Sequence, residues 1–96
     1  MPTYIVLGKM TQQGAQGVKE LPQRRQRARD AAKELGITYR DGWLTMGEYD
    51  VVLVLDAPDG NAMAKFVMRI AMAGNLSTQT LRAFGESEAD DIVSGL

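Results

Sequence analysis

The sequence contains no cysteine and no histidine. These absences exclude disulfide bonds, thiol nucleophiles, histidine general bases, the common axial haem ligands and nearly every zinc site. No apolar run approaches the roughly 20 residues that a membrane span needs, so we expect no membrane association. Because the chain opens without a charged leader and a long apolar stretch, we expect a cytoplasmic protein.

The remaining composition is that of an ordinary folded domain. The chain has 96 residues, of which 45% are hydrophobic and 24% are charged. We expect residues 1–96 to form a single domain with one modest core. Its 11 basic and 12 acidic residues leave a net charge of −1, so we do not expect nucleic acid as a partner. No metal or cofactor is expected, since the acids do not converge in a ligand pattern.

Four segments have the composition of strands: residues 3–8, 37–46, 49–55 and 76–84. In the first and third of these the apolar residues are consecutive, which predicts central strands covered on both faces. The second contains Asp41-Gly42, which predicts a bulge or bend. The fourth alternates polar and apolar residues, as edge strands do.

Two main helices are predicted between these strands. Pro22 suits the first turn of one and Gly36 suits the position just past its end. Asp59 is a predicted N-cap for the other, which runs to Gly74. A short acidic helix is expected over residues 86–93, and residues 11–21 are expected to form a loop with one helical turn that begins at Thr11.

The order of these elements predicts an α+β, ferredoxin-like βαββαβ fold. Its four-stranded antiparallel sheet carries two helices on one face, with a short C-terminal helix besides. Two helices cover only one face, so aliphatic residues of the other would be exposed in a monomer. We therefore expect a homodimer formed through the open sheet face.

Several motifs in this order resemble the GYD domain family: Gly47-Glu-Tyr-Asp50, Thr11-x-x-Gly14, Pro22-Gln-Arg24, Gly36 and Leu81-Arg-Ala-Phe84. The resemblance covers nearly the whole chain. It implies a ferredoxin-like fold of the dimeric α+β barrel group, and it implies no particular activity. Residues 46–55 are also similar to a hairpin and strand in the effector-binding domain of Lrp/AsnC-type regulators, which is an analogy of fold alone.

Tyr49 and Asp50 are the candidate catalytic residues. Asp50 can serve the turn at Gly47 by accepting backbone hydrogen bonds, and we favour this structural role. In the alternative, both residues lie at the mouth of a cleft between the sheet and the helices. There Asp50 would act as a general base if burial raised its pKa.

Arg82 is a candidate ligand-binding residue because an arginine within an apolar strand needs an anionic partner. That partner is either a ligand or a carboxylate, for which Asp50, Asp56 and a second subunit are candidates. Strand alternation puts Thr78 and Thr80 on the Arg82 face. The aromatic residues Tyr39 and Trp43 could line the same ligand pocket or pack in the core.

The segment from Arg24 to Arg29 holds four arginines within six positions. Their mutual repulsion disfavours the helix, which hints at a use. We favour a solvated helix face that acids partly neutralise, namely Glu20, Asp30 and Glu34.

Three functional hypotheses follow. The first is a homo-oligomeric protein that binds a small organic ligand in the cleft between sheet and helices. The second is a cofactor-independent enzyme, similar to an oxygenase or isomerase, that uses Asp50, Tyr49 and Arg82. The third is an interaction module that works through the arginine-rich first helix.

Overall fold

The structure, a computed structural model, describes residues 1–96. The elements in chain order are β1 (Thr3–Met10), α1 (Gln12–Gln16), the 3-10 helix η1 (Val18–Glu20), α2 (Leu21–Glu34), β2 (Thr38–Leu44), β3 (Val51–Asp56), α3 (Gly60–Ala73), β4 (Leu76–Ala83) and α4 (Glu86–Ser94). This order confirms the predicted α+β, ferredoxin-like arrangement.

The four strands form one antiparallel sheet in the order β2-β3-β1-β4. The two strands with consecutive apolar residues, β1 and β3, are central, as predicted. The register of β2 shifts between Tyr39 and Asp41, which confirms an irregularity at the predicted bend. The bulge allows Tyr39 to lie opposite Leu55 while Gly42 lies opposite Leu53.

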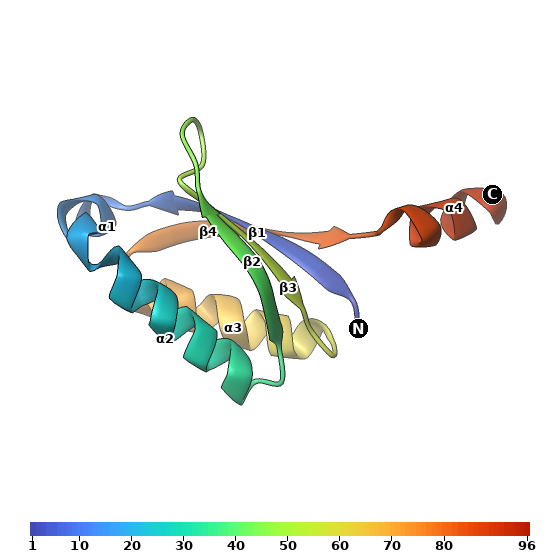
Figure 1. The fold of residues 1–96 in the computed structure, drawn as a ribbon, viewed down its shortest axis with the longest axis horizontal. Coiled ribbons are helices and arrows are strands. Elements are labelled where there is room, and N and C mark those ends of the chain that lie inside the picture. The colour runs from blue at the N-terminus through green and yellow to red at the C-terminus, as the bar shows by residue number, and fades with distance from the viewer.

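Helices α2 and α3 pack on one face of the sheet, and the core lies between these two layers (Figure 1). Phe66 of α3, Leu55 of β3 and Val6 of β1 are its largest fully buried side chains. Ala32 of α2 is also buried, and its small side chain lets this helix approach the sheet closely. As predicted, Asp59 caps α3 by accepting a hydrogen bond from the backbone N–H of Ala62 at 2.8 Å.

The opposite face of the sheet carries no helix. Ile5 lies across from Val54, Leu7 lies across from Val52, and Leu81 of β4 lies across from Ile5. These aliphatic side chains do not belong to the core cluster that the helices cover. The sequence correctly predicted this uncovered aliphatic face.

The segment expected as a loop with one helical turn contains α1 and η1. Thr11 begins the turn: its hydroxyl accepts a hydrogen bond from the backbone N–H of Gly14 at 3.1 Å and donates to the carbonyl of Gly74 at 2.7 Å. A side chain at Gly14 would collide with the carbonyl of Asn75. The Thr11-x-x-Gly14 motif therefore fastens α1 to the start of β4.

The C-terminal helix α4 begins where it was predicted and ends at Ser94, just beyond the predicted end, and none of its residues is buried. It projects beyond the end of the sheet, away from α2 and α3 (Figure 1). No helix of this chain combines the length and the apolar character needed to cross a membrane.

Candidate ligand-binding cleft

A cleft of about 340 Å³ lies between α2, α3 and the sheet. Its size is at the lower end of the range for small-molecule sites. Most of its lining is apolar, and comes from β1, α2, β2, β3, α3 and β4: Met10, Leu21, Ala28, Ala31, Leu44, Val51, Leu53, Ile70, Ala73 and Leu76. The cleft can therefore enclose the apolar body of a small organic molecule.

Every charged residue in the lining is an arginine. Arg24, Arg25 and Arg27 come from α2, and Arg69 comes from α3; the lining contains no carboxylate. The three α2 residues form no ion pair within the chain, whereas Arg69 binds Glu34 with a distance of 2.6 Å between Nη1 and Oε2. The cleft thus combines apolar walls with uncompensated positive charge.

Arg24 is fixed in place by the backbone of the preceding segment. Its Nη1 donates to the carbonyl of Gly14 at 3.0 Å, and its Nη2 donates to the carbonyl of Gly17 at 2.7 Å. Its Nε is buried and has no hydrogen-bond partner. Neutral carbonyls do not compensate a guanidinium charge, so an anion bound nearby would be stabilised.

Arg25 and Arg29 lie one turn apart on the side of α2 that faces β2. The guanidinium carbon of Arg29 lies 5.2 Å from the centroid of the Tyr39 ring. Burial raises the pKa of the Tyr39 phenol, an effect that the positive charges of Arg29 and Arg25 partly oppose and Asp41 reinforces. Tyr39 therefore stays a neutral hydrogen-bonding group at physiological pH.

Two of the predicted ligand-binding residues, Tyr39 and Trp43, do line the cleft. Gly42, between them, also lines it, and a side chain there would collide with the phenol oxygen of Tyr39. The absence of a side chain at this position lets Tyr39 lie across the face of the sheet.

Thr78, Thr80 and Arg82 lie outside the cleft lining. Their predicted common face is supported by the register, which places them opposite Gly8, Val6 and Tyr4. They lie further along the edge strand β4, of which only the first residue, Leu76, lines the cleft.

The anionic partner of Arg82 is Glu88 of α4, with 3.4 Å between Nη2 and Oε2. The prediction of Asp50 or Asp56 as its intramolecular partner was wrong. Asp56 instead pairs with Arg40 at 3.6 Å, and no local pattern in the sequence indicates that α4 lies beside Arg82. Arg82 also lies over the Phe84 ring, with its guanidinium carbon 4.3 Å from the centroid.

Tyr49 and Asp50 also lie outside the cleft. The alternative interpretation, which placed them at the mouth of the cleft, was therefore wrong. The carboxylate of Asp50 accepts a hydrogen bond from the backbone N–H of Met10 at 2.8 Å. The hydroxyl of Tyr49 donates to the side-chain oxygen of Gln79 at 2.9 Å, on the helix-free face. Asp50 therefore ties the β2–β3 connection to the end of β1, a structural role.

These positions separate the residues of the enzyme hypothesis. Asp50 is bonded through its backbone N–H to the carbonyl of Gly8, whereas Arg82 lies opposite Tyr4. Gly8 and Tyr4 are four positions apart in β1, which is about 13 Å along a strand. Asp50, Tyr49 and Arg82 do not form a common site.

The sequence predicted a solvated helix face for the arginines of α2, and Arg25, Arg27 and Arg29 are exposed as well as lying in or beside the cleft. None of the arginines between positions 24 and 29 forms an ion pair with Glu20, Asp30 or Glu34, so any neutralisation by these acids acts at longer range. Asp30 accepts from Gln26, and Glu34 is bound by Arg69. The clustering of arginines in α2 was the signal that pointed to this side of the cleft, of which Arg24, Arg25 and Arg27 form part of the lining.

Comparison with known proteins gives a consistent assignment. Residues 4–93 match the GYD domain family. The chain is also 31% identical, over 84 residues, to a protein of Thermus thermophilus named "Glutamine synthetase and cystathionine beta-lyase binding protein". That alignment covers 86% of this chain and 88% of the relative.

Solved structures share the fold. The crystal structure of MtbAldR superposes with a TM-score of 0.68 at 15% identity and covers 88% of this chain; the chain spans about half of MtbAldR, 52% of its length. The crystal structure of TTHA0845 from Thermus thermophilus gives a TM-score of 0.56 at 24% identity, with 88% of this chain and 95% of that chain covered.

Proposed function

The chain belongs to the GYD domain family, and we propose that it is a homo-oligomeric binding protein that holds a small organic anion in the cleft between its sheet and its helices. The observation that carries this proposal is the lining itself, in which all the charged groups are arginines and nearly all other groups are apolar. A carboxylate or phosphate on an apolar body matches both properties.

The two parts of such a ligand would contact different parts of the cleft. The apolar body would pack on side chains such as Leu53 and Ile70, where it loses contact with water. The anionic group would lie near Arg27, which has no partner in the chain, and Arg69 on the facing helix. Charge-assisted hydrogen bonds to guanidinium groups are stronger than neutral ones, so they would select anions.

The lining favours binding over catalysis. It offers no carboxylate, serine, threonine, lysine, histidine or cysteine, and its one hydroxyl belongs to Tyr39. Burial raises the pKa of that hydroxyl, which makes it a poor base at neutral pH. The cofactor-independent enzyme therefore remains the weaker alternative, and the predicted cytoplasmic location remains a prediction.

Native mass spectrometry of the purified protein tests the ligand class. We expect a non-covalently bound organic acid that dissociates on collisional activation and is lost from an Arg27→Gln variant. The control is Lys33→Gln, which removes a positive charge from the same helix outside the cleft. A bound neutral or cationic compound that survives Arg27→Gln would contradict the proposal.

The helix-free sheet face supports homodimerisation. Ile5, Leu7, Val52 and Val54 form neighbouring pairs across β1 and β3 with no covering element. A second copy, placed face to face, would remove this surface from water. We expect Val54→Asp to shift the protein to monomers in light scattering. Ala64→Asp, which adds the same charge at an exposed position of α3, should leave the dimer intact. An unchanged mass for Val54→Asp would contradict this interface.

A protein partner is a second candidate function, and the name of the Thermus thermophilus relative favours it. That relative is named for binding glutamine synthetase and cystathionine beta-lyase. Titration of this chain against each of those two enzymes, with binding followed by bio-layer interferometry, would test whether it binds either of them. Saturable binding would support it, and no binding at micromolar concentration would contradict it.

A further inference from the structure

Helix α4 has almost no contact with its own chain. Its one side-chain bond to the strands is the exposed Arg82–Glu88 pair. Ala89, Ile92 and Val93 lie on one side of the helix, with Ile92 49% and Val93 65% exposed. An isolated helix of 9 residues is marginal in water, so α4 needs a partner that covers its apolar side.

The charge of α4 indicates the nature of that partner. The helix carries four acids and no basic residue: Glu86, Glu88, Asp90 and Asp91. Within the same chain, α2 carries four arginines that form no ion pair. Near Arg25, the edge strand β2 exposes Leu44 by 66%, on the helical side of the sheet. This surface complements α4 in both charge and apolar character.

Helix α4 cannot reach this surface in its own chain. It follows the edge strand β4 after only Phe84 and Gly85, which together span about 7 Å. Strand β2 is the opposite edge of the sheet, about 14 Å away across three strand spacings, and α2 lies beyond it on the helical side. Helix α3 occupies that side near β4, and α4 points away from both helices (Figure 1).

We propose that α4 docks on a second copy of this chain, where its acids face Arg25 and Arg29 of α2 and its apolar side covers the exposed edge at Leu44. This contact lies at the β2 side of the cleft, whose lining includes Arg25 and Leu44, whereas the proposed anion site uses Arg27 and Arg69. It also differs from the helix-free sheet face. Self-association then depends on opposite charges carried by two different chains.

A charge-swap cycle tests the contact. We expect Asp90→Lys/Asp91→Lys to weaken self-association about tenfold in analytical ultracentrifugation, and Arg25→Glu/Arg29→Glu to do the same. An equimolar mixture of the two variants should associate to within a few-fold of the original affinity, because both contacts of the mixed dimer pair opposite charges. Weakening by each variant without recovery in the mixture would overturn the proposal.

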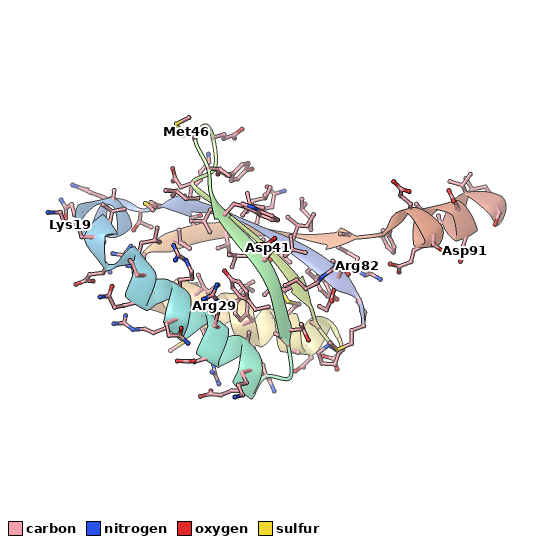
Figure 2. All side chains as sticks on the ribbon, in the orientation of Figure 1. Lys19, Arg29, Asp41, Met46, Arg82 and Asp91 are labelled. Carbon is pink, nitrogen blue, oxygen red and sulfur yellow. The ribbon has the colours of Figure 1, made fainter.

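Cross-linking gives a second readout that does not depend on affinity. The chain has no native cysteine, so Asp91→Cys/Arg29→Cys introduces one defined pair. We expect a short bismaleimide to link these cysteines between chains. The control is Asp91→Cys/Met46→Cys, since Met46 lies fully exposed on the β2–β3 connection, away from α2 (Figure 2). Equal cross-linking of both pairs, or of neither, would contradict docking of α4 on α2.

Discussion

The guanidinium of Arg29 lies over the ring of Tyr39, with 5.2 Å between the guanidinium carbon and the ring centroid. The contact joins the arginine-rich helix α2 to β2, the strand that forms one side of the cleft. It places a cation beside a phenol whose pKa is nevertheless raised, because burial outweighs the attraction of Arg29 and Arg25 for the phenolate. The lining of the cleft therefore holds a neutral phenol and several arginines, and no carboxylate.

The raised pKa of Tyr39 predicts a dependence of stability on pH. The folded state holds the phenolic proton more tightly than the unfolded chain, whose tyrosine pKa is about 10. The stabilisation is thus fully present below about pH 10 and falls as the pH rises through the folded-state pKa. We expect the difference in unfolding free energy between the original protein and Tyr39→Phe to decrease as the pH rises above about 10 in urea titrations. A difference that is constant or grows with pH would contradict this account.

Gly14→Ala tests the fastening of α1 to β4. The added methyl group would meet the backbone carbonyl of Asn75, which cannot rotate away, so we expect a loss of about 1–3 kcal/mol of unfolding free energy. Gly60→Ala is the matched control, because its nearest new contact is an ordinary 3.9 Å to the Tyr4 hydroxyl. Thermal unfolding of both variants gives the comparison, and equal stabilities would refute the close approach at Gly14.

Asp50 provides a test of a structural role against a catalytic one. Its carboxylate accepts the N–H of Met10, and Asp50→Ala leaves that donor without its partner. We expect Asp50→Ala to lose about 1–3 kcal/mol of stability. Asp50→Asn keeps an acceptor oxygen and should lose less. Both variants should retain ligand affinity at temperatures where they are folded; a well-folded Asp50→Asn that cannot bind would contradict the structural role.

The sequence predicted the elements of this fold well because their signals are local. Pro22, Asp59 and Gly74 mark helix ends through backbone chemistry that acts within a few residues. The central positions of β1 and β3 followed from their consecutive apolar residues, although within one chain the helices cover only one of the two faces.

The site was predicted less well because it depends on where elements meet. Strand alternation correctly grouped Thr78 and Thr80 on one face, but it carries no information on how far along that face the helices leave a cleft. Arg69 reaches the cleft from α3, whereas Arg27 lies in α2. No sequence pattern indicates that these two residues lie close together. Tyr39 and Trp43 were proposed because aromatic side chains often line apolar pockets, and both lie in the lining of the cleft.

Binding of paired dyes tests the central claim, that the cleft selects anions with an apolar body. We would titrate the protein with 8-anilinonaphthalene-1-sulfonate and with its uncharged analogue N-phenyl-1-naphthylamine, and follow energy transfer from Trp43, the one tryptophan of the chain. We expect the sulfonate to bind more tightly, and Arg27→Gln to weaken its binding about tenfold while the neutral dye and the Lys33→Gln control stay unchanged. Equal affinities for the two dyes, with no effect of Arg27→Gln on either, would contradict the account.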